Sequence, residues 1–122
     1  EGLFLVDGSG LSRNNALTAR GLASFYQRMQ TRPHYKLWRA TLPNLGVDGD
    51  LRDRCTTSPL KGRVQAKTGL LGAPPARCLA GYLEARSGRL YTFAVLINFY
   101  RKSWRAVDQD TDELLTVLYE AL

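Results

Sequence analysis

The feature that most constrains the fold is a run of three β-prone segments in the second half of the chain, at residues 64–68, 78–85 and 90–98. A loop containing Pro74-Pro75 separates the first two segments, and Ser87-Gly88 separates the second from the third. These are the residue types that end strands and form turns. Connections this short join neighbouring antiparallel strands, because a parallel pair needs a longer crossover. The segments therefore predict an antiparallel meander.

Helical patterns flank this region. Thr18 is a suitable N-cap for a helix that ends near residue 30, in which Leu22, Tyr26 and Met29 recur at helical spacing and are expected to face the core. A shorter helix is expected over residues 35–40.

The C-terminal segment, residues 106–122, has an amphipathic pattern, with acidic residues in its first half, where they suit the helix dipole. Its apolar face is expected to hold Val107, Leu114, Leu115, Leu118 and Leu122.

A short strand is expected over residues 3–6, and residues 42–61 are expected to be mostly loop, with a turn of helix near 51–54. The fold class predicted is α+β, an antiparallel sheet packed with helices.

Length and charge narrow the possible functions. A chain of 122 residues is one domain at most, and no apolar run approaches the ~20 residues of a membrane span. The net charge of +6 fits either an ordinary solvated surface or attraction to an anionic polymer, such as nucleic acid or cell wall. No nucleic-acid partner is expected, because no strand interleaves aromatic and basic residues.

The residues that most often bind metals are sparse. Cys55 and Cys78 lack metal-site spacing, so they are expected to be either buried free thiols or, in an oxidising compartment, a disulfide. His34, beside Pro33 in an expected loop, is the only histidine of the sequence. We expect no metal site and no cofactor.

Two short motifs indicate chemistry. Lys67-Thr68-Gly69 follows, in the expected order, a Ser-Xaa-Asn at Ser12-Arg13-Asn14. Penicillin-recognising serine enzymes combine such motifs with a Ser-Xaa-Xaa-Lys that carries the nucleophile. Each motif alone has a structural explanation: a Ser/Asn-rich turn for the first, and a charged residue that protects a strand edge for the second. Their order favours an acyl-transfer site.

Longer stretches strengthen this interpretation. They comprise residues 7–14, 42–43, 46–54, 62–69 and 79–82, with Asn98. Together with the two motifs, these stretches make the chain similar over nearly its whole length to the D-alanyl-D-alanine carboxypeptidase/endopeptidase family of low-molecular-mass penicillin-binding proteins. The resemblance implies that residues 1–122 are the C-terminal part of a transpeptidase-like domain. It also implies peptidoglycan stem peptides and β-lactams as ligands, and a periplasmic or other extracytoplasmic location.

The resemblance implies catalytic roles for Ser12, Asn14 and Lys67. Ser12 would relay a proton to the leaving amine, and Lys67 would hydrogen-bond to Ser12 and make the site electropositive. Asn14 would bind the acyl-side amide of the substrate.

Substrate binding is implied for the residues that follow Lys67. Thr68 would hold the substrate carboxylate, Gly69 would let a peptide lie against the strand, and the N–H of Leu70 would donate to the oxyanion. The chain departs from the family at Leu70, where Thr or Ser is usual, and at Asp50, where Thr is common. The loop at residues 72–77 also looks about two residues longer than usual.

We further expect the chain to lack the Ser-Xaa-Xaa-Lys motif, and so to be inactive in isolation. The nucleophile would come from an N-terminal part of the same protein. That part, or a second copy, would also pair with the open edge of residues 90–98. The alternative is a non-catalytic module that keeps the fold and binds cell-wall peptide or a partner.

Overall fold

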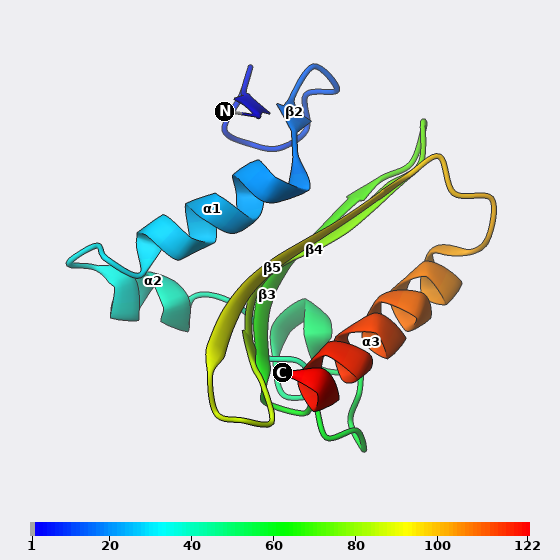
Figure 1. The fold of residues 1–122 in the computed structure, drawn as a ribbon. Helices are drawn as coiled ribbons and strands as arrows, with labels where there is room; N and C mark the ends of the chain where they lie inside the picture. The colour runs from blue at the N-terminus through cyan, green and yellow to red at the C-terminus, as the bar shows by residue number, and fades with distance from the viewer. Residues whose placement is uncertain (1) are drawn as a thin grey trace.

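The computed structural model describes residues 2–122 and has three layers (Figure 1). The helices α1 and α2 lie on one face of the main sheet, and α3 lies on the other. In chain order the elements are β1 (Leu3–Phe4), β2 (Ala16–Leu17), α1 (Ala19–Met29), α2 (Tyr35–Ala40), the 3₁₀ helix η1 (Gly49–Leu51), β3 (Val64–Leu71), β4 (Ala76–Glu84), β5 (Leu90–Asn98) and α3 (Trp104–Ala121). The predicted α+β class is confirmed.

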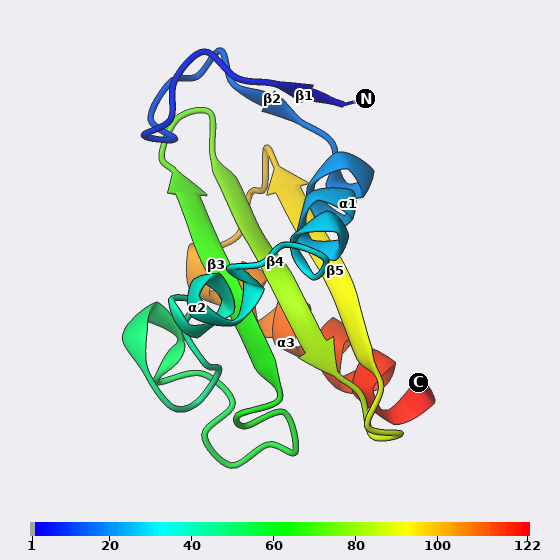
Figure 2. The ribbon, with the colours of Figure 1, turned by 90° about the vertical axis from the view of Figure 1, so that its left-hand side faces the viewer.

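The main sheet is the predicted antiparallel meander, with strand order β3-β4-β5 (Figure 2). β3 is longer than expected, because its pairing with β4 continues beyond Thr68 to Leu71. Gly69 permits this continuation, since a Cβ at that position would overlap the Sγ of Cys78 on the paired strand. A second, two-stranded sheet joins β1 to β2, and the sequence did not predict its second strand.

The core between the sheet and α3 is aliphatic. Its buried members are Leu45, Leu51, Leu60, Val64, Ala66, Leu79, Leu83 and Leu115. The expectation for α3 is wrong at Leu114 and Leu122, which are 45% and 40% exposed. Successive helical residues are 100° apart, so when Leu115 faces the sheet Leu114 points aside. Val107 and Leu115 are buried as predicted, with Asp108 and Thr111 on the same stripe.

The opposite face of the sheet is aromatic. Tyr26, Trp38 and Tyr82 pack with ring centroids 5.3–6.0 Å apart, and the Tyr82 hydroxyl donates to the Tyr26 carbonyl at 2.7 Å. Tyr26 is therefore in the core, as the helical spacing predicted. Thr18 is the N-cap of α1, and its hydroxyl accepts a hydrogen bond from the Gly21 N–H at 3.0 Å.

The two outer strands of the main sheet differ in what covers their free edges. The first half of β3 is covered, because Leu45 donates to the Val64 carbonyl and Ala66 donates to the Pro43 carbonyl. Within residues 2–122, β5 has no partner strand on its outer side.

Cys55 and Cys78 are half-buried free thiols. Across the described part of the chain, no helix is long and apolar enough to cross a membrane.

Candidate active site

Lys67, Thr68 and Gly69 lie in β3, just where its outer edge becomes free. β4 pairs with every residue of β3 on one side. On the other side, an isolated bridge joins Asn44 to Gln65, and no described segment pairs with β3 from Lys67 onward. Backbone groups on such an edge can bind an extended peptide as an added strand.

The side chains of Lys67 and Thr68 converge on one carboxylate. The Lys67 ammonium lies 3.5 Å from Asp50 Oδ2 and also donates to the Thr68 carbonyl at 3.0 Å. The Thr68 hydroxyl donates to the same Asp50 oxygen at 3.2 Å. The Lys67 and Asp50 side chains are 59% and 66% exposed, so water screens this ion pair.

Asp50 is held in place by the turn around η1. Its neighbour Leu51 is fully buried, and the Leu51 carbonyl accepts a hydrogen bond from the Gly46 N–H at 2.9 Å. Gly49 has a φ of +55°, and a Cβ there would lie 2.9 Å from the Pro43 side chain. Only glycine therefore suits this position, and the packed turn presents the Asp50 carboxylate to the edge of β3.

The loop over residues 7–15 is organised by the Asp7 carboxylate, for which the sequence predicted no role of its own. This carboxylate accepts hydrogen bonds from the Gly10 N–H at 3.1 Å, the Ser12 N–H at 2.9 Å and the Asn15 side-chain amide at 2.8 Å. The Asn15 hydrogen bond is the main cause that lowers the pKa of Asp7 below its usual 3.8. An Asp followed by Gly, Ser and Asn is typical of such side-chain-capped turns, and this signal was available in the sequence.

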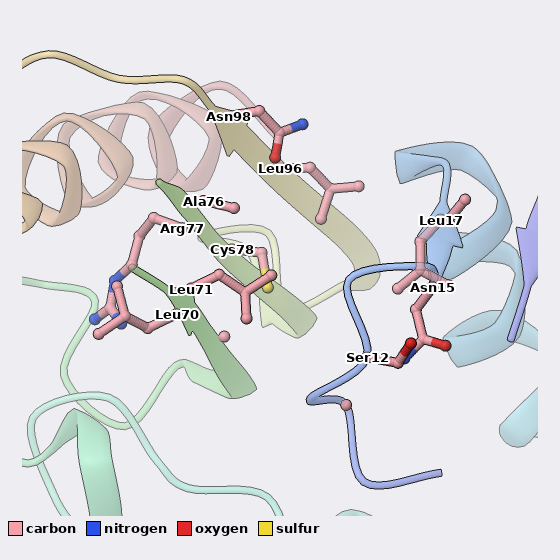
Figure 3. Close-up of a pocket in the computed structure, with 13 residues that line it drawn as sticks. Ser12, Asn15, Leu17, Leu70, Leu71, Ala76, Arg77, Cys78, Leu96 and Asn98 are labelled. Carbon is pink, nitrogen blue, oxygen red and sulfur yellow. The ribbon is translucent and has the colours of Figure 1, made fainter. Parts of the chain in front are cut away.

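A cavity of about 420 Å³ separates this loop from the ends of the main strands (Figure 3). Ser12 and Asn15 lie on its loop side, and Leu70, Leu71 and Cys78 lie on its sheet side. Its lining is Gly10, Ser12, Asn15, Ala16, Leu17, Gly69, Leu70, Leu71, Ala76, Arg77, Cys78, Leu96 and Asn98. Burial raises the pKa of the Cys78 thiol, so the thiol stays neutral near pH 7.

The structure brings only some of the predicted residues together. Ser12, Gly69 and Leu70 line the cavity, and Lys67 and Thr68 precede it on β3, whereas Asn14 is exposed and does not line it. Within the described residues, the predicted hydrogen bond between Ser12 and Lys67 is not formed. The Ser12 hydroxyl instead accepts from the Asn14 N–H at 3.2 Å, because Asp7 holds this loop on the far side of the cavity.

The expectation that the chain lacks a Ser-Xaa-Xaa-Lys was wrong, because Ser58-Pro59-Leu60-Lys61 has that spacing. In the structure these residues form a turn ahead of β3, in which the Ser58 hydroxyl accepts from the Leu60 N–H at 3.2 Å and Lys61 is exposed. The cavity lies at the opposite end of β3, roughly 20 Å away at ~3.3 Å per residue. These four residues therefore form a turn and supply no group to the cavity.

A buried ion network lies behind the strand ends that form the cavity. Arg77 donates to both oxygens of Asp108 in α3, at 2.7 and 2.6 Å, and Arg54 pairs with Asp112 at 2.6 Å. The Asp108 hydrogen bonds are the main cause that raises the pKa of Arg77. The network joins the start of β4, and through it the end of β3, to α3.

Comparisons with known proteins give a consistent result. Residues 1–118 match the family described as D-Ala-D-Ala carboxypeptidase 3 (S13). The chain is 36% identical over 102 residues to a D-alanyl-D-alanine carboxypeptidase of Actinomadura, covering 80% of this chain and 18% of the relative. It is 34% identical over 99 residues to the D-alanyl-D-alanine carboxypeptidase DacB of Haemophilus influenzae, covering 80% and 20%.

Solved structures agree with these sequence matches. Penicillin binding protein 4 (dacB) from Haemophilus influenzae has a TM-score of 0.84 and 31% identity, over 97% of this chain and 28% of that one. The same protein complexed with a β-lactam has a TM-score of 0.86 and 31% identity, over 98% and 29%. The chain thus spans less than a third of each protein that it matches here.

Proposed function

The chain belongs to the D-Ala-D-Ala carboxypeptidase 3 (S13) family, and we propose that it forms one wall of a serine-type D-Ala-D-Ala carboxypeptidase or endopeptidase site. The substrates would be peptidoglycan peptides, met outside the cytoplasmic membrane. The observation that carries the proposal is the position of Lys67-Thr68-Gly69 on a free strand edge that leads into a cavity.

The free edge supplies the contacts that a peptide substrate needs. A peptide that adds itself beside residues 67–71 can pair with their backbone, and Gly69 brings no side chain between them. The Lys67 ammonium attracts an anionic C-terminus, and the Thr68 hydroxyl can donate to it. The Leu70 N–H is assigned to the carbonyl oxygen of the bond to be cleaved, where negative charge develops during attack.

The reaction proposed is acyl transfer. A serine Oγ attacks the carbonyl carbon before the terminal D-Ala, the C–N bond breaks, and the departing amine takes up a proton. Water then hydrolyses the ester and restores the serine. We assign the nucleophile to a Ser-Xaa-Xaa-Lys beyond this chain, because Ser58 lies at the wrong end of β3 and its hydroxyl is engaged within a turn.

We assign Ser12 to the wall opposite Lys67, and Asn14 to the same loop outside the cavity lining. Ser12 lines the cavity, which supports this position. The hydrogen bond to Lys67, with which Ser12 would relay a proton to the leaving amine, requires the loop over residues 7–15 to move toward β3. The assignment of Lys67, Thr68, Gly69 and Leu70 does not depend on that movement.

The test is release of D-Ala from an N-acylated D-Ala-D-Ala peptide by the full-length protein. We expect release that benzylpenicillin blocks, with no release from the matched L-Ala-L-Ala peptide. Binding of the D-peptide without release would favour the non-catalytic module instead. If the protein neither binds nor cleaves the D-peptide, that result would contradict both functions.

A further inference from the structure

Asp50 contacts the Lys67 ammonium and the Thr68 hydroxyl, the two donors that the proposed function assigns to a substrate carboxylate. Its Oδ2 accepts from the Thr68 hydroxyl at 3.2 Å and faces the Lys67 ammonium at 3.5 Å. A single carboxylate oxygen that bridges an ammonium and a hydroxyl makes the same contacts that a peptide C-terminus would make there.

Its position in the turn leaves Asp50 little freedom to move its backbone away. Leu51 is fully buried beside it, and the φ of Gly49 on the other side is one that other residues rarely adopt. A substrate carboxylate at Lys67 and Thr68 would therefore have to displace the Asp50 side chain or lie next to its negative charge.

Resting on the proposed function, we propose that Asp50 is a specificity-determining residue for the C-terminal group of the substrate. It disfavours a free terminal carboxylate and favours a neutral carboxamide, whose NH₂ can donate to Asp50 while its oxygen accepts from Lys67 or Thr68. Leu70 acts in the same direction, because its exposed apolar side chain supplies no further donor for a carboxylate.

The experiment uses the full-length protein and two substrates, N-acyl-D-Ala-D-Ala and its C-terminal amide. Asp50→Asn keeps the shape of the side chain and removes its charge, and Asp50→Thr is a second variant. Both should raise the carboxylate-to-amide ratio of kcat/KM about fivefold, mainly through KM, which is the effect expected for removing one screened charge.

Asp53→Asn is the matched control. Asp53 is exposed in the same loop and, within the described residues, forms no hydrogen bond or ion pair with Lys67 or Thr68. Asp53→Asn should leave the carboxylate-to-amide ratio of kcat/KM within about 1.5-fold of wild type. A rise as large as that of the Asp50 variants would mean that any nearby negative charge has this effect, and it would overturn the assignment to Asp50.

The other outcomes are distinguishable. If the wild-type protein cleaves both substrates and both Asp50 variants keep its ratio, the inference is wrong and the proposed function stands. If the wild type neither cleaves a D-Ala-D-Ala peptide nor reacts with penicillin, the proposed function fails and removes this inference with it.

Discussion

The two regions that face the cavity are held in place by different means. Lys67, Thr68 and Gly69 belong to an eight-residue strand paired along its whole length with β4. The loop over residues 7–15 lies on the other side of the cavity and relies mainly on the hydrogen bonds of one half-buried carboxylate, Asp7. One wall is therefore rigid and the other is adjustable.

This difference indicates where function can tolerate movement. A strand supported by a core and by buried ions keeps its donors aligned before a substrate arrives, which is the arrangement that favours catalysis. A loop held by a few partly exposed hydrogen bonds opens at lower energetic cost than a strand paired along its whole length, and such segments often move on ligand binding.

The largest effect is expected on stability, from Asp108→Ala. Asp108 is 7% exposed, and its loss leaves Arg77 buried without its carboxylate, which typically costs about 3 kcal/mol. Chemical denaturation of the full-length protein measures this change. Asp110→Ala on the same helix, which breaks an exposed ion pair with Lys102, should cost less than about 1 kcal/mol. Equal costs for the two would refute a special role for the buried network.

Lys67→Ala tests the rigid wall. It removes a charge and a hydrogen-bond donor, so kcat/KM for a D-Ala-D-Ala peptide should fall about 100-fold or more. Lys61→Ala, an exposed lysine ahead of β3, is the matched control and should leave kcat/KM unchanged. A fall of less than about threefold for Lys67→Ala would remove this residue from the site.

Ser12→Ala tests the adjustable wall. No described hydrogen bond joins the Ser12 hydroxyl to Lys67, so kcat/KM should fall by at most about tenfold, less than for Lys67→Ala. A loss as large as that of Lys67→Ala would show that the loop closes and that Ser12 relays the proton during turnover.

Asp7→Asn should loosen the loop while leaving the strand intact. The amides of Gly10 and Ser12 should exchange with solvent faster by about tenfold, whereas those of β4 should not change, as amide hydrogen exchange can show.

Acid should also loosen this loop, because the pKa of Asp7 is lowered in the folded state. Its stabilisation is present above pH 3.8 and is lost as the pH falls through the lowered value. Unchanged exchange in the variant would mean that other contacts hold the loop.

Much of the fold could be predicted from the sequence, because its signals are local. β-prone segments between turn residues predicted the meander, and the Thr18 N-cap and helical spacing predicted α1. The 35–40 helix was also correct. The end of β3 was missed because its pairing with Cys78 on β4 depends on the absence of a side chain at Gly69, which is a tertiary effect.

The site was predicted less completely, for a similar reason. Motif order indicated Lys67 and Ser12, but not that Asp50, distant in sequence, would contact Lys67 and Thr68. Spacing alone also fails at Ser58, where a Ser-Xaa-Xaa-Lys pattern is only a turn. A motif becomes a site through the positions of its residues, and those depend on long-range packing.

The assignment of the nucleophile is tested most directly by labelling the full-length protein with a fluorescent penicillin and mapping the labelled peptide by mass spectrometry. We expect a label on a serine outside residues 2–122, with labelling unchanged by Ser58→Ala, and no covalent labelling of the isolated chain. A label on Ser58, or on any other residue of this chain, would contradict it.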